Sequence, residues 1–279
     1  PIVFGWSCGN LPAFFYVKNH SLEYAEDFVT LFHALSSKGL RKVHVICHSM
    51  GCQVWCKNFP VIAKQCFLPC ERRARVNQFS VADPKLLQLA NVIFMNGEAL
   101  VEELAEAASG EESLLNYADR LTLYIDGNDV ACLASQVAQQ LLPWRRQQWR
   151  DPELNVRATK VLGRIVTDYH VHVQQADWKV LALGGSIVDE VMPDSWRARH
   201  GCDEDGTFIY NRCIDVIDCT NLDTNAGFSR HNYWGLNALM AEDIVTCIST
   251  CTPAVNRRHL VRRKDNIFDY LSPPSILTA

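Results

Sequence analysis

The chain alternates between short apolar runs and longer segments with helical periodicity, and this alternation constrains its fold more than any other feature. We interpret the apolar runs as strands and the segments between them as helices. The expected strands span 1–6, 42–48, 90–97, 120–129 and 212–220, and the expected helices span 21–38, 50–58, 98–109, 130–142 and 234–250. Strands separated by helices of this length predict an α/β fold with a mostly parallel sheet and helices on both faces.

Three residues mark expected helix boundaries. Ser21 is a suitable N-cap for the helix over 21–38, and Gly39 is a suitable C-terminal stop. Pro60 is expected to end or kink the helix that begins at Met50, because proline removes a helical hydrogen bond.

The same pattern predicts one discontinuous core domain with an insertion. Residues 1–142 and 212–250 contain the regular alternation. Residues 143–211 are too long for a simple connection and hold four tryptophans, so we expect a cap or inserted subdomain there. Residues 251–279 are expected to form a basic C-terminal tail with a solvated face.

Charge and hydropathy argue against two classes of partner. The net charge of −4 gives no electrostatic reason to expect nucleic acid. No apolar run approaches the roughly 20 residues needed to cross a bilayer, so we expect no transmembrane segment.

The chain contains 12 cysteines, several of them within apolar runs. We expect reduced, buried thiols, because a chain of this size needs no disulfide framework and its cysteine spacings do not form a zinc motif. The expectation is therefore a cytoplasmic protein with no metal site.

The stretch "KVHVICHSMGCQVW" at 42–55 has the order of a nucleophile elbow: a strand, a serine at a sharp turn, and a helix that begins at once. Gly51 supplies the small residue after Ser49, whereas Cys47 stands where glycine is usual. The alternative is that Ser49 merely caps the following helix.

An acid and a histidine follow later strands in the order that an α/β hydrolase requires. Asp129 lies in the Gly-Asn-Asp loop into which the strand segment over 120–129 runs, and His231 lies in the loop after the strand over 212–220. Both positions are at carboxyl ends of strands, where open parallel sheets bind ligands. Asp126 is the alternative acid, and Asp129 is preferred because it lies beyond a Gly-containing turn.

The other histidines are weaker candidates. His44 is expected within the strand, and His48 is expected to point away from the turn because side chains alternate along a strand. His170 and His172 alternate like one face of a strand but have no evident third metal ligand.

Four motifs in this order resemble the alpha/beta hydrolases of unknown function in the esterase/lipase superfamily: "FGWSCGN", "VHVICHSMG", "LTLYIDGNDVA" and "IDVIDCT…FSRHNYW". The resemblance covers most of 1–135 and 212–245. It implies a serine hydrolase with Ser49 as nucleophile, Asp129 as acid and His231 as base. It also implies further strands upstream, so we expect the chain to be truncated at its N-terminus and to lack the first strands of the fold.

The resemblance implies cleavage of a carboxylic ester, or a related acyl bond, of a small molecule without a cofactor. The backbone N–H of Met50 would supply one oxyanion donor, and the second is expected upstream of this chain. Two alternatives remain open at this point. One is a catalytically inactive scaffold that binds a ligand or protein through the Trp-rich insertion, and the other is an acyltransferase that uses the same triad.

Overall fold

The computed structural model describes the central part of the sheet, the helices that pack on it and the C-terminal strands. The described residues are 2–3, 24–70, 85–99, 101–108, 112–127, 129–132, 214–222, 231, 237–264 and 267–271. The insertion predicted over 143–211 lies outside them, as does most of the strand predicted over 1–6. Ile2 and Val3 from that strand are exposed and belong to no strand.

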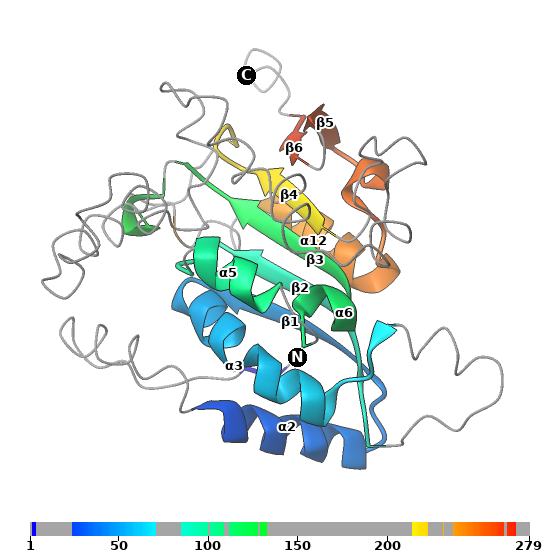
Figure 1. Ribbon diagram of the computed structural model, residues 1–279. Helices are drawn as coiled ribbons and strands as arrows, with labels where there is room; N and C mark the ends of the chain where they lie inside the picture. The colour runs from blue at the N-terminus through cyan, green and yellow to red at the C-terminus, as the bar shows by residue number, and fades with distance from the viewer. Residues whose placement is uncertain are drawn as a thin grey trace, which may run out of the picture.

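Within these residues six strands form one sheet in the order β1-β2-β3-β4-β6-β5 (Figure 1). The strands from β1 to β6 in this order are parallel, and only β5 runs antiparallel to its neighbour. Their bounds are β1 Lys42–His48, β2 Gln88–Met95, β3 Ala118–Ile125, β4 Ile214–Asp218, β5 Leu260–Lys264 and β6 Ile267–Tyr270. The predicted α/β class with a mostly parallel sheet is confirmed.

Helices cover both faces of the sheet. Successive side chains of the central strands point to opposite faces, so each strand contributes to a core on either side. On β2, Phe94 packs in a core that includes helices α2, α3, α5 and α6, whereas Ile93 and Met95 pack in a second core with α12. The helices are α2 Ala25–Ser37, α3 Met50–Cys66, α5 Val101–Ala107, α6 Leu114–Tyr117 and α12 Ala238–Thr250. Because both faces of these strands are buried, nearly every position along them has to be apolar.

Two of the helix boundary predictions can be compared with the structure. Gly39 follows the end of α2 with a positive φ of 89°, and its N–H bonds to the Ser36 carbonyl, so the predicted stop is correct. The predicted end at Pro60 is wrong, because α3 continues through it to Cys66. Phe59 and Ile62 on either side of the proline are fully buried, and their packing outweighs the lost helical bond. The predicted cap Ser21 lies outside the described residues.

The prediction of a basic tail over 251–279 also requires correction. Strands β5 and β6 lie within that range, and β6 pairs with β4 in the main sheet. The basic residues of β5 do not mark a solvated tail, because Arg263 donates to the carboxylates of Asp218 on β4 and Asp269 on β6. Ile267 and Phe268 are buried in the core.

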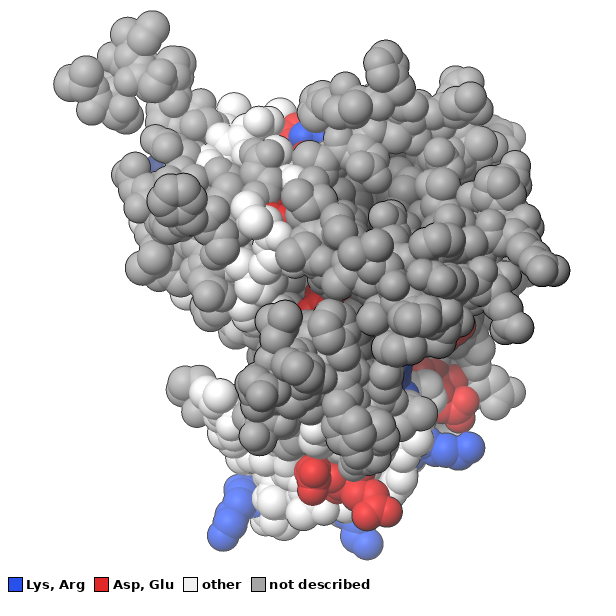
Figure 2. Space-filling view, turned by 90° about the vertical axis from the view of Figure 1, so that its left-hand side faces the viewer, with Lys and Arg blue, Asp and Glu red and all other residues white. Residues whose placement is uncertain are grey.

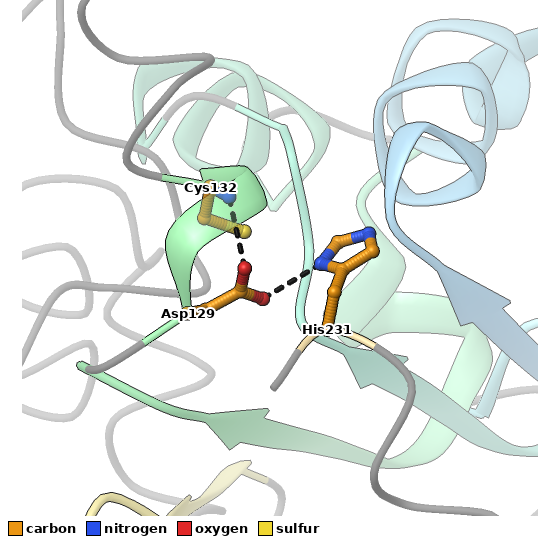
Figure 3. Close-up of side chains that lie close together, drawn as sticks. All are labelled: Asp129, Cys132 and His231. Carbon is orange, nitrogen blue, oxygen red and sulfur yellow. Dashed lines mark hydrogen bonds and ion pairs between the residues drawn. The ribbon is translucent and has the colours of Figure 1, made fainter. Parts of the chain in front are cut away.

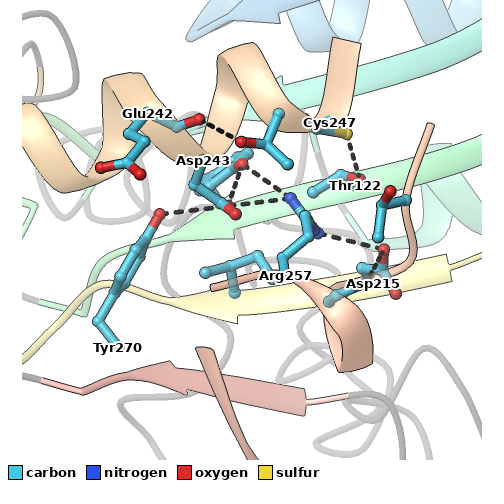
Figure 4. Close-up of polar contacts among 12 residues, drawn as sticks. Thr122, Asp215, Glu242, Asp243, Cys247, Arg257 and Tyr270 are labelled. Atoms are coloured by element: carbon cyan, nitrogen blue, oxygen red, sulfur yellow. Dashed lines mark hydrogen bonds and ion pairs between the residues drawn. The ribbon is translucent and has the colours of Figure 1, made fainter. Parts of the chain in front are cut away.

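A buried ionic cluster joins this C-terminal region to the sheet and to α12 (Figure 4). The Arg257 guanidinium is fully buried and lies 3.2 Å from Asp215 Oδ2 on β4 and 2.9 Å from Asp243 Oδ2 on α12. The hydroxyls of Tyr124 on β3 and Tyr270 on β6 donate to the same Asp243 oxygen at 2.6 Å and 3.3 Å. Burial raises the pKa of Asp243, although Arg257 and both hydroxyls favour its charged form.

Cysteine thiols pack in the described core as small apolar side chains. No disulfide joins any two of the nine described cysteines, and seven of them are buried: Cys47, Cys52, Cys56, Cys66, Cys132, Cys219 and Cys247. Burial raises the pKa of the Cys66 thiol to about 11. Thiols in such surroundings stay protonated and unreactive at neutral pH.

Charged side chains of both signs lie next to one another at the lower end of the face seen in Figure 2. In the described part of the chain, no helix combines the length and the apolar character needed to span a membrane.

Replacing Arg257 should strongly destabilise the fold. Arg257→Met leaves the buried carboxylates of Asp215 and Asp243 without their shared cation, and we expect the free energy of unfolding in urea to fall by about 3–5 kcal/mol. Lys64→Met is the control, because Lys64 is 75% exposed and pairs with Glu112 at the surface. Its loss should cost less than about 1 kcal/mol. Equal losses in the two variants would contradict the role of the cluster.

Candidate active site

The candidate site forms where the carboxyl ends of β1, β2 and β3 lie level with one another. His48 pairs with Met95, and Met95 pairs with Tyr124, so the residues that follow these strands share one edge of the sheet. The ladder continues one step further, because the Ser49 N–H bonds to the Met95 carbonyl and the Asn96 N–H to the Tyr124 carbonyl. This edge is where open parallel sheets place their ligands.

Ser49 occupies a strained turn between β1 and α3. Its φ is 53° and its ψ is −127°, a conformation that side-chain-bearing residues rarely adopt and that costs on the order of 1–3 kcal/mol. Its side chain makes no capping hydrogen bond to α3, so the alternative reading of Ser49 as an ordinary N-cap does not hold. The strand, the strained serine and the immediate helix are the geometry expected of a nucleophile elbow.

Asp129 and His231 come together although they are 102 positions apart in the chain (Figure 3). His231 Nδ1 lies 2.7 Å from Asp129 Oδ2, and the Asp129 side chain is fully buried. Asp126, the alternative acid, is also buried, and its backbone carbonyl accepts the Asp129 N–H. The carboxylate that contacts the His231 ring is that of Asp129.

Three hydrogen bonds surround the Asp129 carboxylate. Besides His231 Nδ1, Asn96 Nδ2 donates to Oδ2 at 2.7 Å and the Cys132 N–H donates to Oδ1 at 2.9 Å. Burial acts to raise the pKa of Asp129, but these bonds outweigh it and hold the pKa below its ordinary value. Asp129 is therefore ionised at neutral pH and can only accept, which assigns a proton to His231 Nδ1; in the neutral form of the ring, Nε2 is then the acceptor.

His48 links the strand that precedes Ser49 to His231. The His48 ring lies with its centroid 4.8 Å from that of His231, and Ser49 is the next residue in the chain. Among the described residues, however, no hydrogen bond joins the Ser49 hydroxyl to His231. Catalytic hydrogen bonds are often long before substrate binds. Met50, the first residue of α3, has an N–H that its own helix leaves without an acceptor.

Asp129, Cys132 and His231 are also the described residues that could hold a metal ion, since one donor atom from each lies within 4.8 Å of the others. Burial and the Asp129 charge raise the pKa of the Cys132 thiol, which favours its protonated, non-ligating form. That thiol donates to the Asn96 carbonyl, and the Asp129 oxygens already accept three hydrogen bonds. These contacts fit a hydrogen-bonded acid–imidazole pair better than a metal centre.

Sequence reasoning missed two residues of this site. Asn96 follows β2 with a positive φ of 46°, and an asparagine directly after a buried strand is a signal for such a conformation. The sequence predicts that His48 points away from the turn, but its Nε2 lies 3.0 Å from the His231 carbonyl oxygen. Simple alternation fails here because the chain turns sharply at the next residue. His44, by contrast, stays within β1 and contacts Asn91, while His170 and His172 lie outside the described residues.

Residues 1–143 match the family described as alpha/beta hydrolase of unknown function (DUF900), which confirms the resemblance of the sequence motifs. The match covers just over half of the 279 residues and includes Ser49 and Asp129. No curated protein and no solved structure matches the chain.

Strain at Ser49 can be measured by comparing two substitutions. Ser49→Gly relieves the positive φ, whereas Ser49→Ala keeps the strain and also removes the hydroxyl. We expect the free energy of unfolding of the glycine variant to be roughly 1 kcal/mol higher than that of the alanine variant. In a helix or strand with ordinary backbone angles, glycine would instead be less stable than alanine. Urea unfolding of both proteins measures the difference, and a more stable alanine variant would show that the turn is unstrained.

Asn96 should control the ionisation of Asp129. Asn96→Gly tolerates the positive φ but removes the amide donor, so the pKa of Asp129 should rise. Asn96→Asp places a second carboxylate there and should raise it further. The pKa of Asp129 can be measured from the ¹³C shift of its carboxyl, followed by NMR as a function of pH. It should be lowest in the wild type, higher in the glycine variant and highest in the aspartate variant.

The stability of the Asn96→Gly variant then depends on pH with a defined sign. The folded pKa of Asp129 lies below its unfolded value, so its charge stabilises the fold above the unfolded pKa, and this contribution is lost as the pH falls through the folded pKa. The variant lacks part of that contribution at neutral pH. Its deficit relative to the wild type should shrink in acid, and a deficit that grows in acid would contradict the assignment.

Proposed function

Because the chain belongs to the alpha/beta hydrolases of unknown function (DUF900), and so has a hydrolase scaffold, we propose that it is a serine hydrolase that cleaves a carboxylic ester or related acyl bond of a small molecule. The observation that carries the proposal is the 2.7 Å contact of His231 Nδ1 with Asp129 Oδ2 beside the strained turn at Ser49.

In the proposed reaction the Ser49 hydroxyl attacks the carbonyl carbon of the substrate. His231 Nε2 accepts the hydroxyl proton and then passes it to the leaving alcohol as the ester C–O bond breaks. Water attacks the resulting acyl-serine by the same route in reverse and releases the acid. Each proton moves through Nε2, while Nδ1 keeps its proton on the side of Asp129.

Asp129 supports this proton transfer without changing its own protonation. Its carboxylate fixes the tautomer and orientation of the imidazole and stabilises the imidazolium that forms in the transition state. The lowered pKa of Asp129 supports this role, because the group stays ionised throughout the cycle. The Met50 N–H would bind the oxyanion, since donors at the start of a helix favour developing negative charge.

A fluorophosphonate probe tests the proposal directly, since it reacts with activated serines. We expect labelling of the full chain at Ser49, located by mass spectrometry, and no labelling of Ser49→Ala. Asp129→Asn should slow labelling by about 10³–10⁴-fold, because it favours the wrong tautomer of the base. Ser249→Ala, at an exposed serine of α12, is the matched control and should label like the wild type.

A folded protein whose Ser49 does not react would contradict the proposal and favour a catalytically inactive scaffold that binds a ligand or protein. If Ser49 reacts, p-nitrophenyl esters of increasing acyl length give the substrate preference. An added alcohol then separates hydrolysis from acyl transfer, because a transferase would release mainly the new ester rather than the free acid.

A further inference from the structure

His48 makes a second contact with the proposed base, to a different group of His231 from the one that Asp129 contacts. Its Nε2 lies 3.0 Å from the His231 carbonyl oxygen. A carbonyl oxygen can only accept, so His48 Nε2 carries a proton and donates it. The two rings lie 4.8 Å apart between centroids, at 45° to each other.

The two contacts hold different parts of His231. Asp129, from the loop after β3, holds the ring through Nδ1, whereas His48, the last residue of β1, holds the backbone through the carbonyl. His231 lies beyond β4 and belongs to no helix or strand. Among the described residues, the side chains of Asp129 and His48 are the ones that bond to His231.

His48 is also joined to Ser49 by a single peptide bond. A residue that contacts the backbone of the base and directly precedes the nucleophile connects the two reacting groups, so a shift of this residue would change their separation. Displacements of about 1 Å at a reacting centre can cost on the order of 10²-fold in rate, so such a contact has a kinetic effect even though it touches no substrate.

We propose that His48 is a positioning residue, whose Nε2–H bond to the His231 carbonyl aligns the base with Ser49. This inference rests on the proposed function, in which Ser49 is the nucleophile and His231 the base. Partial burial and the neighbouring His231 lower the pKa of His48, while its bond to the carbonyl and the Asp129 charge act in the opposite direction. His48 is thus neutral at neutral pH and adds no charge beside the imidazolium that forms on His231.

Two substitutions at His48 separate its hydrogen bond from its shape. His48→Phe keeps a ring of similar size but removes the donor, whereas His48→Gln keeps an N–H donor at a comparable reach. We expect the phenylalanine variant to react with the fluorophosphonate probe about 10–100-fold more slowly and the glutamine variant to recover most of the rate. With an ester substrate the loss should fall on kcat and leave KM nearly unchanged.

His44→Phe is the matched control, because His44 is on the same strand but bonds to Asn91 away from the site. It should react at the wild-type rate, and urea unfolding should show that all three variants are folded. Equal rates for His48→Phe and the wild type, or equal losses for the phenylalanine and glutamine variants, would overturn the role of the hydrogen bond. Absence of labelling in the wild type would overturn the proposed function itself, and this inference with it.

Discussion

The parallel register of β1, β2 and β3 is the constraint on which the site depends. It aligns the carboxyl ends of the three strands. Ser49, Asn96 and the loop that holds Asp129 therefore lie at one edge of the sheet, although they are far apart in the sequence. The register is fixed by burial on both faces, because a slip of one residue would move Phe94 from one core to the other and exchange it with Ile93 or Met95. The chemistry of the edge is therefore a consequence of packing in the middle of the sheet.

The same packing supports the strained conformation at Ser49. A residue at φ 53° persists only where its surroundings determine it, and both flanks of Ser49 are held. Its N–H donates to the carbonyl of Met95, the last residue of β2, and its carbonyl accepts the N–H of Glu98 just after that strand. Helix α3 begins directly at Met50, whose side chain is buried. The serine is thus presented by rigid elements rather than by a loose loop, which is the arrangement that a nucleophile needs.

The sequence predicted the central strands, their parallel arrangement and the order of the three candidate residues, because apolar periodicity and loop position are local signals. It failed where a tertiary contact decided the outcome. Helix α3 passes through Pro60 because its flanks are buried. Strands β5 and β6 join the sheet because β6 pairs with β4 and Arg263 of β5 bonds to Asp218 of β4. The turn of His48 toward His231 depends on a residue 183 positions away, which no local pattern contains.

Arg257 links packing inside the fold to the placement of His231, although Arg257 itself does not lie at the site. Its cluster fixes β4 through Asp215 and α12 through Asp243, and these two elements carry the ends of the segment that contains His231. The segment leaves β4 after Asp218 and enters α12 at Asn237, whose side chain caps the helix. Both anchors are thus set by buried charges that tolerate little displacement. His231 can then be placed by two further hydrogen bonds, one to its ring and one to its backbone, because the sheet and helix on either side already limit where its loop can run.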